Sequence, residues 1–99
     1  AELREIFETS YGIFSGKNRQ VAKLKFTPFR AQWVAREVWH PEQVGEVHSD
    51  GSYTLEVPYG EDWELIQDIL RQGHDVEVLA PVALKKKVKE TAQKILALY

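Results

Sequence analysis

A chain of 99 residues has room for one folded domain with a single core and is too short to enclose a deep cavity. Its composition, 43% hydrophobic and 28% charged, is ordinary for a globular protein. It has no cysteine, which excludes disulfides and thiol chemistry and fits a reducing compartment, so we expect a cytoplasmic location. No apolar run approaches the ~18 residues of a membrane span, so we expect no association with a membrane.

Charge is unevenly distributed behind the net value of −2. Residues 17–36 carry six basic side chains and no acidic one, whereas residues 37–68 carry nine acidic side chains and no lysine or arginine. Residues 81–99 carry five lysines and one glutamate. This segregation predicts basic and acidic faces that affect partner docking, although each block is also compatible with a merely solvated surface.

The chain is expected to begin with a short helix over residues 1–9, followed by a linker with aromatic anchors over residues 10–16. It contains no methionine, and we expect it to be a piece cut from a longer protein. From Val21 to Phe26, apolar residues then alternate with lysines, which predicts a strand with one face on a core.

A helix should follow this strand, because Thr27 is a good N-cap and Pro28 suits the first helical position. We expect the helix to end near Val38 or Trp39, since Pro41 biases the preceding residue away from helical angles.

Three further strands and two helices are expected. The strands span residues 43–48, 52–59 and 75–79, and the helices span residues 62–72 and 81–99. Asp50 and Gly51 predict a two-residue hairpin loop, because a type I′ turn needs positive φ at both positions. Gly73 is expected to stop the first of these helices. The apolar stripe of the last helix is Leu84, Val88, Ala92, Ile95 and Tyr99.

The element order from Val21 to Leu79 is β-α-β-β-α-β. It predicts an α+β fold of the ferredoxin-like type, a sheet with both helices on one face, extended by an N-terminal and a C-terminal helix.

The uncovered sheet face is expected to show Lys23 and Lys25, flanked by Glu56 and Glu77 on neighbouring strands. Cross-strand pairing of opposite charges is the ordinary finish for such a face, and a phosphate-binding strip is the alternative.

No catalytic or metal-binding pattern is evident, so we expect neither an enzyme nor a cofactor. The three histidines, His40, His48 and His74, have no i,i+4 spacing, and zinc would need three or four converging ligands. The junction after the first strand lacks a glycine-rich phosphate cradle, and no nucleophile elbow is present.

Basic and aromatic residues are interleaved in and just after the helix expected to start at Thr27 and Pro28. Such a mixture is typical of surfaces that stack the bases of single-stranded nucleic acid. The alternative is that the tryptophans anchor a core or an interface and the arginines are solvated. The residues concerned are Arg30, Trp33, Arg36, Trp39 and His40.

A succession of short motifs covers nearly the whole chain. They are Tyr11-Gly12-Ile13-Phe14, Phe26-Thr27-Pro28, Trp33-Val34, Trp39-His40-Pro41-Glu42-Gln43, Asp50-Gly51-Ser52, Val76-Glu77-Val78-Leu79-Ala80-Pro81 and Leu98-Tyr99. In this order they resemble the WCX module, the C-terminal extension of WYL-domain transcriptional regulators of bacteria. On that resemblance, residues 1–20 are a linker from the WYL domain and residues 21–99 are the WCX domain.

The resemblance implies a homodimeric regulator in which a helix-turn-helix domain and a WYL domain precede this module. It also implies that the module helps to sense an effector, which is single-stranded DNA in some members. Two alternatives stay open: a purely structural dimerisation module and a small-molecule sensor. We expect an effector or interdomain surface formed by Arg30, Trp33, Arg36, Trp39, His40 and Gln43.

Overall fold

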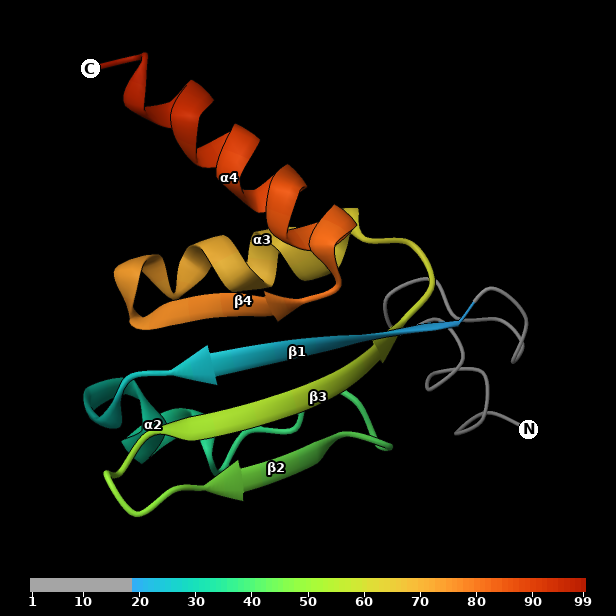
Figure 1. Cartoon of the computed structure of the whole chain (residues 1–99), viewed down its shortest axis with the longest axis vertical. Coiled ribbons are helices and arrows are strands. Elements are labelled where there is room, and N and C mark those ends of the chain that lie inside the picture. Colours follow the sequence, from blue (N-terminus) through green and yellow to red (C-terminus); the bar gives the residue numbers. More distant parts are fainter. Residues whose placement is uncertain (1–18) are drawn as a thin grey trace.

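In the part of the chain that the structure describes, a four-stranded antiparallel sheet is accompanied by three α-helices (Figure 1). The computed structural model describes residues 19–99, so the helix and linker expected over residues 1–16 lie outside the described residues. The elements are β1 (Gln20–Phe26), α2 (Pro28–Val34), β2 (Val44–Val47), β3 (Tyr53–Tyr59), α3 (Trp63–Arg71), a 3-10 turn (Gly73–Asp75), β4 (Val76–Ala80) and α4 (Val82–Leu96).

The strands lie in the order β2-β3-β1-β4, and every neighbouring pair is antiparallel. The predicted α+β class, the four strands and the three helices within the described part of the chain are confirmed. Most strand ends differ from the predicted ones by one residue, and the others agree. A difference of one residue is within the usual uncertainty of element ends.

One face of the sheet forms the core, and its residues follow the predicted alternation. Ala22, Leu24 and Phe26 of β1 are fully buried, whereas the lysines between them are exposed. The partners of β1 in the core are Tyr53, Leu55, Val57 and Tyr59 of β3, Val78 of β4, Ala31 and Val34 of α2, Leu65 and Ile69 of α3, and Leu84 of α4. The described helices thus cover one face of the sheet, and none of them covers the other, which we call the open face.

The strand β2 packs closely under an aromatic ring of its neighbour. A Cβ atom at Gly45 would overlap the side chain of Tyr53, so only glycine lets the tyrosine lie across β2. The Tyr53 ring is buried against Phe26, at 6.3 Å between ring centroids.

The helix α2 ends at Val34, so the predicted end near Val38 or Trp39 is wrong. The backbone N–H groups of Arg36 and Glu37 donate to carbonyls three residues earlier, which tightens and closes the last turn. Pro41 lies inside the loop that follows, in which the Gln43 side chain binds the backbone of residues 37–40.

The β2–β3 hairpin is present, but its loop has three residues rather than the predicted two. The His48 N–H donates to the Ser52 carbonyl, and the Gly51 N–H donates to the His48 carbonyl. Gly51 has a φ of +91°, which matches the left-handed position that ends such a loop. The glycine prediction is therefore right, and the loop length is wrong.

The helix α4 packs only through its first turns. Leu84 is fully buried and Val88 is partly buried, in agreement with the predicted stripe. The stripe then leaves the core, because Ile95 is exposed and Tyr99 is fully exposed. Figure 1 shows the C-terminal part of α4 extending away from the sheet.

Candidate functional site

The loop between α2 and β2 is held by the side-chain amide of Gln43. Its Oε1 atom accepts the N–H of Trp39 at 2.6 Å and the N–H of His40 at 3.1 Å. Its Nε2 atom donates to the carbonyl of Glu37 at 2.9 Å. The Gln43 side chain therefore provides hydrogen-bond partners for two N–H groups and one carbonyl of the loop. These backbone groups belong to no helix or strand that would pair them.

His40 lies inside this loop and is only 4% exposed. Its Nδ1 atom accepts the N–H of Glu42 at 2.9 Å, which requires that this nitrogen carries no proton. Burial lowers the pKa of His40 below its ordinary value; nearby Glu42 opposes this shift and Arg19 adds to it. Arg19 also forms an ion pair with Glu42, which ties the loop to the start of β1.

Trp39 completes the loop by packing on the core. Its ring meets Phe26 edge to face with 5.7 Å between centroids, and its Nε1 atom donates to the Glu37 carboxylate at 3.0 Å. Half of the predicted surface residues, Trp39, His40 and Gln43, thus have contacts that shape this loop.

The other half, Arg30, Trp33 and Arg36, lies on α2 or directly after it. Trp33 is 47% exposed, and Phe29, which the sequence analysis had not singled out, is 62% exposed. The two rings meet at 5.1 Å between centroids with 67° between their planes. We call the surface of Phe29, Arg30, Trp33 and Arg36 the α2 patch.

Arg30 is held in one orientation at the centre of the α2 patch. Its guanidinium lies over the Trp33 ring, 5.7 Å from the centroid. Its Nε atom donates to Oε1 of Gln72 at 2.6 Å. Gln72 is 7% exposed, and its Nε2 atom donates to the Asp68 carbonyl at 3.4 Å.

Sequence reasoning had missed Gln72 as well as Phe29. Gln72 contacts Arg30 across 42 positions of sequence, so no local pattern could have revealed it. Phe29 carried a detectable signal, because it lies four residues before Trp33 and such residues are neighbours on a helix.

The acidic side chains around the α2 patch are engaged by other groups. Glu37 accepts the hydrogen bond from the Trp39 indole, and Asp68 is paired with Arg71. Within residues 19–99, no carboxylate lies within 4.0 Å of the cationic nitrogens of Arg30 or Arg36. The α2 patch is therefore a cationic and aromatic surface.

The open sheet face has the predicted neighbours. Lys23 lies opposite Glu56 of β3, and Lys25 lies opposite Glu77 of β4. Among the residues that the structure describes, none of these lysine–glutamate pairs comes within ion-pair distance. The strand register is thus as predicted, but these lysines and glutamates do not form the predicted ion pairs.

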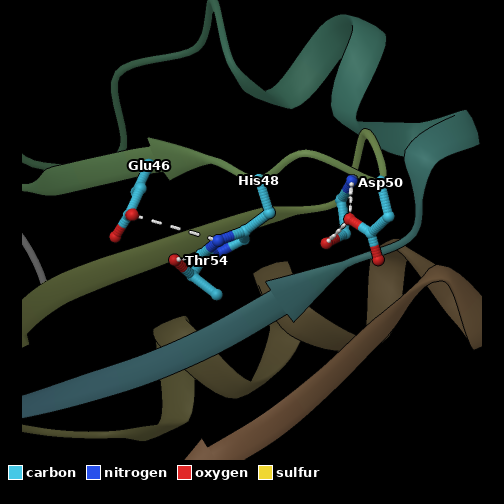
Figure 2. Close-up of polar contacts among 5 residues, drawn as sticks. Glu46, His48, Asp50 and Thr54 are labelled. Atoms are coloured by element: carbon cyan, nitrogen blue, oxygen red, sulfur yellow. Dashed lines mark hydrogen bonds and ion pairs between the residues drawn. The ribbon is translucent and has the colours of Figure 1, made fainter.

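A polar cluster lies at the β2–β3 end of the open face (Figure 2). Figure 2 shows the His48 ring beside the side chains of Glu46 and Thr54; its Nε2 atom is 2.9 Å from the threonine hydroxyl. Beyond it, Oδ1 of Asp50 accepts both the N–H and the hydroxyl of Ser52, and these bonds lower the pKa of Asp50. The cluster closes the hairpin, and each contact in it is local.

The three histidines lie in separate places: His40 in the α2–β2 loop, His48 beside the hairpin and His74 in the 3-10 turn. Residues 19–99 contain no group of three His, Cys, Asp or Glu side chains that could hold a metal ion. No helix in this part of the chain is both long and apolar enough to cross a membrane.

Comparison with known proteins identifies the family. No curated protein matches the chain. The family model of the WCX domain matches residues 18–96. This range includes the described sheet, the three described helices and the α2 patch. The chain therefore belongs to the WCX domain family.

Proposed function

We propose that this chain is the non-enzymatic regulatory module of a cytoplasmic, WYL-type DNA-binding transcriptional regulator. Membership of the WCX family supports a module associated with regulators. The specific role proposed is to transmit an effector signal through the α2 patch, either by contacting the effector or by contacting another domain of the same regulator.

We further propose that the fold is ferredoxin-like. Read from the other edge, the strand order is β4-β1-β3-β2, and each β-α-β crossover skips the strand that lies between its two ends. A matching sheet with right-handed crossovers in an experimental structure would establish this assignment.

The observation that carries the functional proposal is the fixed orientation of Arg30, whose guanidinium has no carboxylate within 4.0 Å among residues 19–99. A charged side chain that serves only solubility gains nothing from a fixed orientation, because ordering a long side chain costs entropy. Arg30 is nevertheless held between Trp33 and the buried Gln72. Two occupants fit this chemistry: a single-stranded nucleic acid and an acidic protein segment.

The test replaces Arg30 and Arg36 by glutamine in the full-length regulator and measures the effector response, with single-stranded DNA as the first effector. The response should weaken although the melting curve shows that the variant remains folded. A matched control replaces Lys85 and Lys86, two exposed lysines on α4, by glutamine and should respond like the wild type. An unaltered response in the arginine variant would refute the assignment.

Dimerisation is a second candidate function, favoured by the far end of α4. This end presents Ile95, Leu96, Leu98 and Tyr99 to solvent, and exposed apolar patches can mark interaction sites. In this alternative, substitution of Leu96 and Leu98 by glutamate turns a dimer into a monomer in light scattering. The effector response would then be lost together with the dimer. The variant with glutamine in place of Arg30 and Arg36 would remain dimeric and would still respond to the effector.

A further inference from the structure

We infer that the α2 patch docks an acidic protein segment, with a carboxylate on Arg30 and an apolar side chain against Phe29 and Trp33. This inference rests on the proposed function, in which the α2 patch is an effector or interdomain surface, and it names the class of partner.

The first argument is the geometry of Arg30. Its Nε atom donates a hydrogen bond to Gln72, and one face of its guanidinium lies over the Trp33 ring. Gln72 is itself fixed by its bond to the Asp68 carbonyl. Among the residues that the structure describes, no hydrogen bond or ion pair uses the terminal nitrogens of the fork. They can therefore bind an external acceptor, and a guanidinium binds a carboxylate in two parallel hydrogen bonds.

The second argument is the angle between the two exposed rings. Successive bases of a single strand stack on nearly parallel aromatic platforms. Phe29 and Trp33 are inclined by 67°, and Arg30 already lies over the tryptophan. The rings form a corner rather than a platform, and a corner suits a branched or aromatic side chain of a protein.

The third argument is charge complementarity. The helix α2 carries no acidic residue, Glu37 accepts a hydrogen bond from the Trp39 indole, and Asp68 is ion-paired with Arg71. An incoming acid therefore meets two cations, Arg30 and Arg36, without a competing acid on the helix. Arginine and tryptophan are also the residues most enriched among those that dominate protein interfaces.

Gln72 is a positioning residue in this arrangement. Replacement by glutamate would give Arg30 a carboxylate inside the molecule and so occupy the cation. Replacement by methionine would keep the volume and release the guanidinium. Both variants should weaken docking while their melting curves show that they remain folded, and a folded variant with unchanged docking would contradict the positioning role.

The test is a selection from a random peptide library displayed on phage, with the 99-residue chain as the target and its Arg30→Gln variant as the counter-target. We expect selected peptides to share an aspartate or glutamate next to an aromatic or branched residue. Their affinity, measured by fluorescence anisotropy, should fall roughly tenfold or more in Arg30→Gln, Arg30→Lys, Trp33→Ala and Gln72→Glu. The control Lys85→Gln should bind like the wild type.

Three results would overturn the inference. These are selected peptides without an acidic residue, selected peptides that bind Arg30→Gln equally well, and no enrichment of any peptide. Tighter, Arg30-dependent binding of oligo(dT) than of every selected peptide would assign the patch to nucleic acid instead. The proposed function would survive each of these results if the arginine variant of the full-length regulator still loses its response.

Discussion

At the scale of single residues, the motif Trp-His-Pro-Xaa-Gln acts as a device that builds a loop. Gln43 pairs three backbone groups, His40 pairs a fourth, and Trp39 anchors the loop to the core through Phe26. The loop follows directly after α2 in the chain. Its buried contacts therefore set where the exposed α2 patch ends.

Replacing Gln43 by alanine should lower the free energy of unfolding by about 1–3 kcal/mol, because it leaves backbone donors of the loop without their acceptor. Urea denaturation of the 99-residue chain measures this change. The matched control is Gln32→Ala, which removes an exposed amide with one bond to a nearby carbonyl and should cost less than about 0.5 kcal/mol. Equal costs for the two variants would contradict the role assigned to Gln43.

His40 should make stability depend on pH. Burial lowers its pKa in the folded chain below the value of 6.5 expected when unfolded, so the unfolded chain takes up a proton first as pH falls. The stabilisation is complete above the unfolded pKa and is lost as pH falls through the folded pKa. Urea denaturation between about pH 7.5 and about pH 5 should show this loss.

The matched variant is His40→Asn, which retains an oxygen acceptor for the Glu42 N–H but cannot titrate in this range. Its stability should change less with pH than that of the wild type. The same slope in both proteins would show that other groups cause the dependence. An NMR titration of the His40 ring would report its pKa directly.

At the scale of elements, the two halves of α4 differ in what they contact. Leu84 in the first turn is fully buried, whereas Leu96 in the last turn is 73% exposed. An ion pair of Lys87 with Asp62 at 2.6 Å further ties the first half to the start of α3. The first half of α4 is therefore part of the fold, and the second half is available to a partner.

Leu84→Ala should cost about 2–5 kcal/mol of unfolding free energy, because it opens a cavity in the core. Leu96→Ala should change it by less than about 0.5 kcal/mol in dilute solution. Thermal and urea denaturation at low protein concentration compare the two variants. A large cost at Leu96 would mean that the end of α4 is packed in solution.

At the scale of the whole molecule, the sheet should be least stable at its β2 edge. The strands β1 and β3 are central and carry most of the core, whereas all four residues of β2 are exposed. Native-state hydrogen exchange should therefore find the slowest amides in β1 and β3 and faster ones in β2 and the last turns of α4. Slow exchange throughout the end of α4 would instead reveal a partner there.

The sequence by itself determined the class of fold, the element order and the family. The alternation in β1 and β3, the Gly73 stop and the glycine of the hairpin are local signals that each residue carries independently of distant partners. The family resemblance was likewise readable because its motifs occur in order along the chain, and the WCX match confirms it.

Only the tertiary structure decided which candidate residues face solvent. Trp33 and Trp39 look alike in the sequence, yet one is exposed beside Arg30 and the other packs on Phe26. The orientation of Arg30 by Gln72 and the packing of Trp39 on Phe26 depend on contacts between residues far apart in sequence. Local propensity contains no information about such contacts, because the free energy that decides them comes from packing and long-range hydrogen bonds.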